Sequence, residues 1–136
     1  MKKFKNYNGD IGIEEIEELE KLIMAKLPND YREHVLKSNG GKVSFEKEYI
    51  IRHDNREFCL SGFYPIKNGA SNVKDYFNNK HNFLYPNLLP IGYIALGYKE
   101  GNYGEIYFYF SDELPFKVAS SFKSFLKNIE VQDSDI

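Results

Sequence analysis

The chain contains a single cysteine, Cys59, and no tryptophan. One thiol cannot form an internal disulfide, so the fold of these 136 residues must be held by a hydrophobic core. The apolar run Phe58–Leu60 around the cysteine predicts a small, buried and unreactive side chain. His34, His53 and His81 show no metal-ligand spacing, and we expect neither a metal site nor a cofactor.

A basic excess and a long hydrophobic run are also missing. Twenty acidic residues against eighteen basic ones give a net charge of −2, which disfavours a general nucleic-acid binder. No stretch approaches the ~20 apolar residues of a membrane-spanning helix. The charged N-terminus MKKFKNYNGD lacks the apolar segment of a secretory signal. We therefore expect a cytoplasmic protein that contacts neither nucleic acid nor membrane directly.

Catalytic motifs are missing as well. His53-Asp54 falls in a polar turn, without the serine motif of a nucleophile elbow. The glycines from Gly92 to Gly104 match neither of the common phosphate-binding motifs. His34 lies on or beside the apolar face of an expected helix, where a core or boundary histidine is the usual reading. No catalytic residue is predicted, and the sequence favours binding over turnover.

What the chain does contain is a strong helix signal from residue 13 onward. Apolar residues recur at helical spacing and predict a buried stripe of Ile13, Ile16, Leu19 and Ile23. Glutamates take most other positions and predict a solvated acidic face of Glu14, Glu15, Glu17, Glu18 and Glu20. Gly12 can act as N-cap, and the carboxylates near it suit the positive end of the helix dipole.

A second helix is expected directly after the first. Leu27-Pro28 should end the first helix and open the second, because proline lacks the amide hydrogen that a helix start does not use. The buried side of this second helix is predicted to be Tyr31, Val35 and Leu36. Asn39-Gly40-Gly41 should close it with a glycine in the left-handed conformation.

The remainder of the chain predicts a sheet and a closing helix. The expected strands cover residues 43–45, 48–51, 58–64, 91–98 and 105–110, with a hairpin turn at 53–56. Ser71 could cap a short helix, residues 78–82 could form its exit, and residues 122–129 predict an amphipathic helix before an acidic tail at 132–136. The fold class is thus α+β, a single domain over residues 1–136 with a core of about 12–130. We expect a mainly antiparallel, meandering sheet with a helix pair before it and a helix after it.

Tyrosine and phenylalanine together make up 16% of the chain. In residues 101–110 they alternate, which predicts a core face with Phe108 at its centre. The opposite face would carry Tyr103, Glu105, Tyr107 and Tyr109. Such a stripe is either a second half-buried face or an amphipathic partner-binding surface, and the sequence does not decide between them.

The helix pair carries a family signature. Leu27-Pro28-x-Asp30-Tyr31, followed by Leu36 and Asn39-Gly40-Gly41, resembles the N-terminal signature of the SUKH superfamily, the Smi/Knr-like domain. Residues 61–65, 89–92, 101–102, 105–110 and 119–126 resemble its later strands and its closing helix in collinear order. The resemblance implies structural roles for the motif residues Leu27, Pro28, Asp30, Tyr31, Leu36, Asn39, Gly40 and Gly41.

The resemblance also implies a function. Bacterial members of this superfamily are generally immunity proteins, which bind a cognate polymorphic toxin, often a nuclease, and occlude its active surface. The implied partner is a protein toxin encoded nearby, and Glu14, Glu15, Glu17 and Glu18 would steer a basic toxin towards the helix. A regulatory scaffold, as in fungal relatives linked to cell-wall synthesis, is the alternative. A small ligand-binding protein or hydrolase is the third, and no oligomeric state is predicted.

Overall fold

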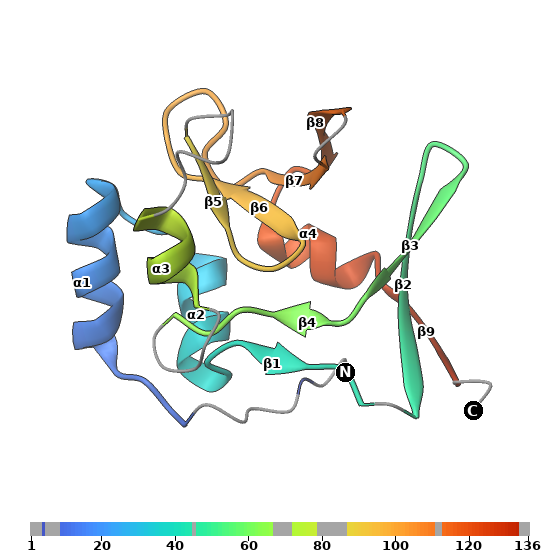
Figure 1. Ribbon diagram of the computed structural model, residues 1–136, viewed down its shortest axis with the longest axis horizontal. Coiled ribbons are helices and arrows are strands. Elements are labelled where there is room, and N and C mark those ends of the chain that lie inside the picture. Colours follow the sequence, from blue (N-terminus) through green and yellow to red (C-terminus); the bar gives the residue numbers. More distant parts are fainter. Residues whose placement is uncertain are drawn as a thin grey trace.

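The structure is a computed structural model that describes residues 4, 9–44, 46–66, 72–78, 87–110 and 113–133 (Figure 1). The helices are α1 (Ile13–Ile23), α2 (Asn29–Lys37), α3 (Val73–Asn78) and α4 (Phe122–Lys127). The strands are β1 (Gly41–Lys42), β2 (Lys47–His53), β3 (Arg56–Leu60), β4 (Gly62–Phe63), β5 (Leu88–Pro90), β6 (Ile94–Gly97), β7 (Ile106–Phe110), β8 (Glu113–Ala119) and β9 (Glu130–Asp133).

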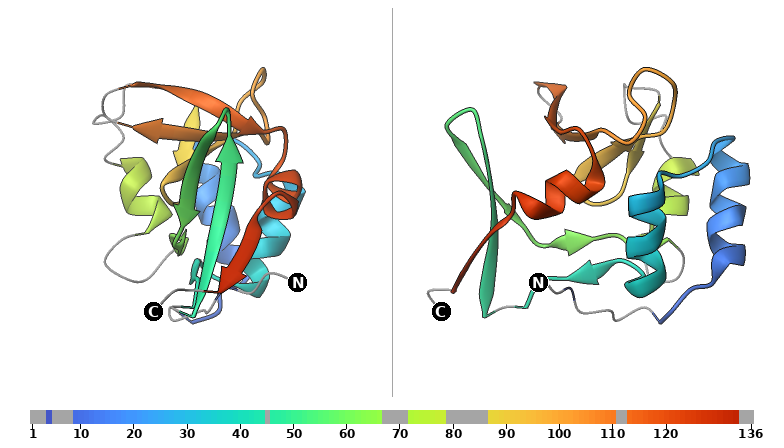
Figure 2. Two further views of the ribbon diagram at one scale, coloured as in Figure 1. Left: turned by 90° about the vertical axis from the view of Figure 1, so that its right-hand side faces the viewer. Right: turned by 180° about the vertical axis from the view of Figure 1, so that it is seen from behind.

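Within the described ranges the strands form three antiparallel sheets, in the orders β1-β4, β3-β2-β9 and β5-β6-β7-β8. α3 lies on the face seen in Figure 1, whereas α2 and α4 lie on the opposite face, and α1 stands at one side (Figures 1 and 2). The predicted α+β class is confirmed. The sheet differs from the prediction, because three small sheets replace one meandering sheet.

The core joins the helices to the sheets. Ile16, Leu19 and Ile23 of α1 are buried, and so are Tyr31 and Val35 of α2. The ring of Tyr31 packs edge-on against Phe122 of α4, with ring centroids 5.3 Å apart. A fully buried side chain of this size stabilises a fold by roughly 1.5–3 kcal/mol. The helix pair is therefore anchored on the C-terminal helix and not only on its neighbours in sequence.

The predicted ends of both helices need correction. α1 ends at Ile23, before the expected Leu27, because Met24 adopts a left-handed conformation with φ of 60°. α2 ends at Lys37 with an extended Ser38 as its cap. Gly40 does have a positive φ of 82°, but it lies two residues beyond that cap. There a Cβ atom would stand only 2.6 Å from the backbone nitrogen of Pro65, so close chain packing requires the glycine.

Three side chains of the helix pair do not lie where the pattern places them. Ile13, the first residue of α1, is exposed, although the pattern predicts a buried position. Glu20, expected on the solvated face, is buried together with Ile16, Leu19 and Ile23. Leu36 is exposed, because it follows Val35 by about 100° around the helix and turns away from the face that Tyr31 and Val35 share.

Several strand predictions also change. Val43 and Ser44 form no strand, and Phe45 lies outside the described residues. The expected strand 58–64 is split at Ser61 into β3 and β4, which belong to different sheets. The expected strand 91–98 is reduced to β6, and the sequence pattern predicts neither β5 nor β8. The first two residues of the expected acidic tail, Gln132 and Asp133, belong to β9, which pairs with β2.

Cys59 is exposed, which makes the prediction of a buried thiol wrong. Side chains of a strand alternate between the two faces of its sheet. Phe58 packs partly against the core and Leu60 is buried there, so Cys59 between them points to the other face.

The hairpin turn at residues 53–56 and the closing helix are confirmed. Asp54 and Asn55 both have positive φ, 48° and 65°, which is the geometry of a two-residue turn between antiparallel strands. α4 begins after Ser121, whose hydroxyl accepts a hydrogen bond from the backbone nitrogen of Ser124. α3 contains Val73 and Tyr76 as expected, but Asn72 precedes it and its Oδ1 accepts a 2.8 Å hydrogen bond from the backbone nitrogen of Asp75; the expected cap Ser71 and residues 79–82 lie outside the described part of the chain.

Candidate functional site

The signature residues at the start of α2 act within the fold. Leu27 and Tyr31 are buried, and Pro28 is the N-cap of the helix. One oxygen of Asp30, Oδ2, accepts a hydrogen bond of 3.0 Å from the backbone nitrogen of Lys123 in the first turn of α4. These side chains pack or form hydrogen bonds within the fold. We therefore assign them a structural role and not a partner-binding one.

Asn39 has a similar role after α2. It is fully buried; its Nδ2 donates to the carbonyl of Gly9 at 3.1 Å, and its Oδ1 accepts from the backbone nitrogen of Ile66 at 2.9 Å. One amide thus joins the segment before α1, the end of α2 and the chain after β4. A buried polar side chain with both of its ends bonded holds such segments together without an unpaired group.

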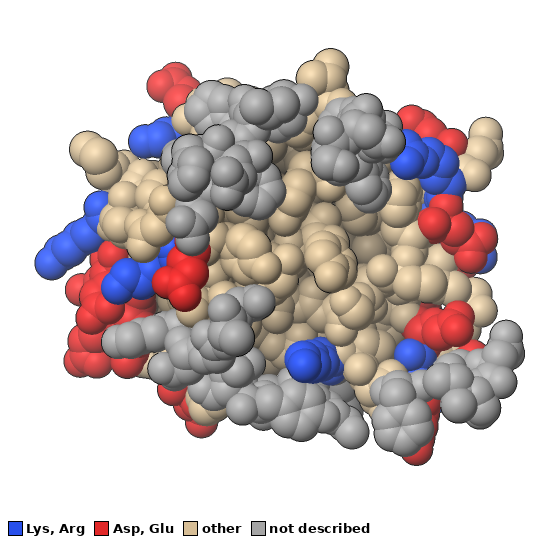
Figure 3. Space-filling view, in the orientation of Figure 1, with Lys and Arg blue, Asp and Glu red and all other residues tan. Residues whose placement is uncertain are grey.

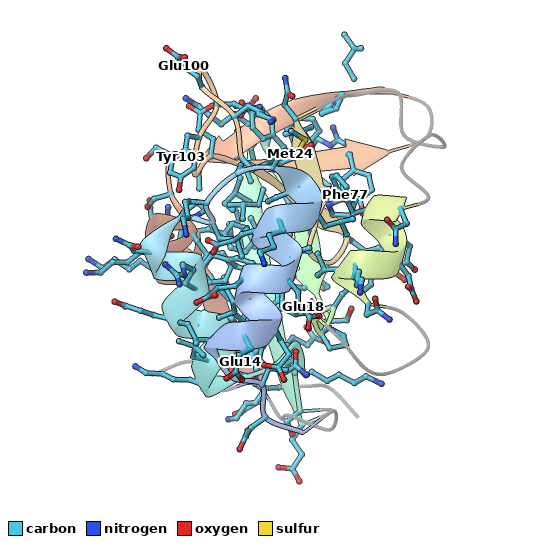
Figure 4. All side chains as sticks on the ribbon, turned by 90° about the vertical axis from the view of Figure 1, so that its left-hand side faces the viewer. Glu14, Glu18, Met24, Phe77, Glu100 and Tyr103 are labelled. Atoms are coloured by element: carbon cyan, nitrogen blue, oxygen red, sulfur yellow. The ribbon has the colours of Figure 1, made fainter. Side chains whose placement is uncertain are left out.

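The acids of α1 differ in exposure. Glu14, Glu17 and Glu18 are exposed, and Figure 4 shows Glu14 and Glu18 on the outward side of the helix. We call these three residues the acidic face. Glu15 is half-buried, and its carboxylate accepts a 2.9 Å hydrogen bond from the backbone nitrogen of Gly12, as the capping pattern predicts.

Glu20 is an acid of this helix that the sequence places on the solvated face but that is buried in the structure. Its side chain is only 5% exposed, and Oε2 accepts a 2.7 Å hydrogen bond from the backbone nitrogen of Leu27. Lys26 Nζ lies 3.7 Å from Oε1 and Arg32 Nε lies 3.9 Å from Oε2. Helical spacing could have revealed this position, because Glu20 follows Ile16 by four residues and precedes Ile23 by three.

The predicted tyrosine stripe is divided among separate contacts. Tyr103 lies in the turn between β6 and β7, beside the α1–α2 connection, where its hydroxyl donates to the carbonyl of Lys26 at 2.8 Å (Figure 4). Tyr107 donates to Oε1 of Glu105 at 2.6 Å, and Lys117 lies 3.2 Å from Oε2 of the same carboxylate.

Those contacts shift the titration of the pair. The hydrogen bond from Tyr107, aided by Lys117, holds the pKa of Glu105 below its ordinary value. Burial, together with that hydrogen bond and the negative charge of Glu105, raises the pKa of Tyr107 to about 12.

The third tyrosine of the stripe is also bonded within the fold. Tyr109 is half-buried, and its hydroxyl donates to the carbonyl of Gly92 at 2.7 Å. Only the ring of Tyr103 is exposed, so the stripe is mostly a second half-buried face.

The match to known proteins is to one family. The model of the SMI1 / KNR4 family (SUKH-1) matches residues 11–128, which is most of the chain. The chain belongs to the SMI1/KNR4 family. No curated protein and no solved structure matches it. The matched range begins two residues before α1 and ends one residue after α4, so it includes the helix pair and the closing helix.

A second group of tyrosines in this SUKH protein has no signal in the sequence. The rings of Tyr64, after β4, and Tyr76, on α3, are stacked 4.5 Å apart with an angle of 13° between them. Tyr93, in the turn between β5 and β6, meets Tyr64 edge-on at 6.4 Å. A groove of about 320 Å³ lies beside them, lined by residues of β1, β4 and that turn. The residues come from four separate segments, so no local pattern brings them together.

The histidines are dispersed in this SUKH domain. His34 packs against the rings of Phe4, Phe63 and Phe122, and burial, with the charge of Lys37 nearby, lowers its pKa to about 4. His53 stacks on Phe116 with centroids 5.3 Å apart. His81 lies outside the described residues.

The described ranges contain neither a grouped set of metal ligands nor a helix suited to cross a membrane. Among these residues no three His, Cys, Asp or Glu side chains are grouped so that they could hold a metal ion. None of the helices that the structure describes is both long and apolar enough to cross a membrane.

Proposed function

We propose that this SUKH protein is a cytoplasmic immunity protein, which binds a cognate protein toxin and occludes its active surface without catalysing a reaction. The observation that carries the proposal is that the residues of the family signature are engaged inside the fold, whereas the surface of α1 is open to a partner. The signature residues Asp30, Tyr31 and Asn39 are buried or bonded inside the fold. The acids Glu14, Glu17 and Glu18 are exposed on the neighbouring helix.

The acidic face indicates the charge of the partner. A cluster of acidic side chains lies in Figure 3 on the side where Figure 1 places α1, with basic side chains beside it; further acids lie on the opposite side. A nuclease toxin carries a basic cleft for phosphate groups, and an acidic surface steers such a partner into encounter. We infer that the acidic face accelerates association with a basic toxin. Glu15 contributes less, because its carboxylate caps the helix.

Protection of a cell demands a tight complex. A toxin that kills at low copy number must be held with a Kd of ~1 nM or below, which corresponds to about −12 kcal/mol. A standard interface buries about 1,600 Å² in total, more than the acidic face alone can supply. The proposal therefore requires at least one further contact surface besides α1.

Co-expression tests this function. Cells that produce the C-terminal toxin domain that the proposal expects to be encoded beside this chain are compared with and without the intact protein, and the purified pair is examined by size-exclusion chromatography. We expect survival with the protein, death without it, and a stable complex. A regulatory scaffold or an unrelated binding protein would give neither survival nor a complex, and that result would reject the proposed function.

A further inference from the structure

The groove beside the tyrosines has a floor of backbone. Gly62 of β4 and Gly92 of the β5–β6 turn both line it, and a Cβ atom on Gly92 would stand 3.0 Å from the carbonyl oxygen of Gly62. The two segments therefore approach more closely than most side chains would allow. Lys42, Tyr64 and Tyr93 line the same hollow of about 320 Å³. We call this the tyrosine groove.

The walls of the tyrosine groove are fixed before any partner arrives. Tyr64 is held by its stack on Tyr76. The turn that carries Tyr93 is held by the hydrogen bond from the Tyr109 hydroxyl to the carbonyl of Gly92 and by the bond from the Tyr64 backbone nitrogen to the carbonyl of Ile91, 2.9 Å long. A surface that is already ordered loses little conformational entropy on binding, which favours affinity.

Tyr93 is unusually open for so large a side chain. It is 70% exposed, although neighbouring Ile91 and Ile94 are fully buried. The centre of the face in Figure 3 carries few acidic or basic side chains, and charged residues gather at its sides. Tyrosines on an ordered backbone within an area of few charges, with charged residues around it, are typical of the energetic centre of a protein interface.

The charge of the groove indicates what it binds. Lys42 is exposed and is the one charged side chain among the described residues that line the groove; no acid lines it. An apolar or aromatic side chain would gain contact with the ring of Tyr93. A carboxylate beside that side chain would face Lys42, and a basic neighbour would be repelled. The complementary ligand is thus an acidic polypeptide segment that presents an apolar side chain.

We propose that the tyrosine groove is the anchor of the immunity complex, where an apolar side chain from an acidic segment of the toxin docks. This proposal rests on the proposed function and names the second surface that it requires. The acidic face acts at long range and sets the association rate. The tyrosine groove acts after docking and sets the dissociation rate, because short-range aromatic contacts break only when the complex separates.

The test measures binding kinetics with the purified domain of the cognate toxin that the proposed function expects. Tyr93→Ala removes the exposed ring, and Lys42→Glu reverses the charge at the groove. Each has a matched control: Leu114→Ala truncates another side chain that is 72% exposed, on β8, and Lys127→Glu reverses an exposed charge on α4, which lies on the opposite face of the molecule. Thermal unfolding of all four variants verifies that they are folded.

We expect Tyr93→Ala to raise the dissociation rate by about tenfold or more, with a nearly unchanged association rate. Lys42→Glu should raise the dissociation rate several-fold. Both controls should stay within about twofold of the wild-type rates. If the wild-type protein binds and both groove variants dissociate as slowly as the controls, the tyrosine groove is not the anchor, while the proposed function stands. If the wild-type protein forms no complex with the toxin domain, the proposed function and this inference both fail.

Discussion

The carboxylate of Asp30 accepts a hydrogen bond from the backbone nitrogen of Lys123, 93 residues further along the chain. The contact places the start of α2 against the first turn of α4. An acid at this position satisfies a backbone donor that the helix leaves unpaired and also meets the positive end of the helix dipole. Asp30 is therefore a cap that α4 receives from a distant part of the sequence.

Replacing Asp30 by Ala should destabilise the protein by about 1–2 kcal/mol, since a backbone donor of α4 loses its cap. Urea unfolding measures this free energy. Glu33→Ala, at an exposed position of the same helix, is the control and should change it by less than about 0.5 kcal/mol. Equal stability of the two variants would show that the Asp30–Lys123 contact does not hold the helices together.

Two substitutions of Tyr31 should change the stability of the protein in different directions. Its ring is fully buried against Phe122, but its hydroxyl is buried without a hydrogen-bond partner among the described residues. Tyr31→Ala should cost roughly 3–5 kcal/mol through the cavity it leaves. Tyr31→Phe should be neutral or stabilise by about 1 kcal/mol, because it removes an unpaired polar group. A large loss of stability in the Phe variant would mean that the hydroxyl is bonded.

His34 should make the stability depend on pH. Its pKa in the folded protein is about 4, below the ordinary value of 6.5, because burial among aromatic rings disfavours the charged form. The unfolded chain therefore binds the proton first as the pH falls, and stability is lost between pH 6.5 and 4. The loss attributable to this group is roughly 2–3 kcal/mol.

His34→Phe isolates that contribution, because other titrating groups are shared by the two proteins. Unfolding free energies measured at pH 7, 5.5 and 4 should show the variant losing less stability on acidification than the wild type. Parallel curves for the two proteins would indicate that the imidazole is open to solvent.

Glu20 should matter for stability although it belongs to an acidic helix. Glu20→Ala leaves the backbone nitrogen of Leu27 without its acceptor and should cost about 1–3 kcal/mol. Glu20→Gln keeps an acceptor and should cost less. Glu17→Ala, one turn earlier on the exposed side, should be close to wild type. These differences appear in the midpoint of urea unfolding; a Glu20→Ala variant as stable as Glu17→Ala contradicts the assigned contact.

The sequence predicts those elements whose signals are local. The turn at Asp54-Asn55 is one, since Asp and Asn tolerate the left-handed backbone it needs. The cap formed by Gly12 and Glu15 is another. The alternation that places Ile106 and Phe108 in the core is a third.

Elements that depend on partners elsewhere in the chain were not predictable in this way. β9 has four exposed residues and no apolar alternation; it pairs with β2, supported by Lys47–Asp133 and Arg52–Glu130 ion pairs. β8 contains Pro115, which argues against a strand but is tolerated because β8 is the edge of its sheet.

The two candidate surfaces also differ in whether a local sequence pattern predicts them. The exposed acids of α1 follow from helical periodicity, with Glu20 as the exception that a stricter count of the period would have found. The tyrosine groove does not follow from any local pattern, because Lys42, Tyr64 and Tyr93 meet only once β1, β4 and the β5–β6 turn are packed together.

The central claim, that the protein recognises a basic toxin through α1, is tested most directly by the association rate constant at low and at physiological salt. The comparison is between the wild type and a variant in which Glu14, Glu17 and Glu18 are all replaced by Lys, with Glu15 kept as the helix cap. The three positions are exposed, so the variant should melt close to the wild-type temperature. We expect its association with the toxin domain to be slower by about tenfold or more at low salt and to lose the acceleration that low salt gives the wild type. Equal rate constants for the two proteins at both salt concentrations would contradict the account.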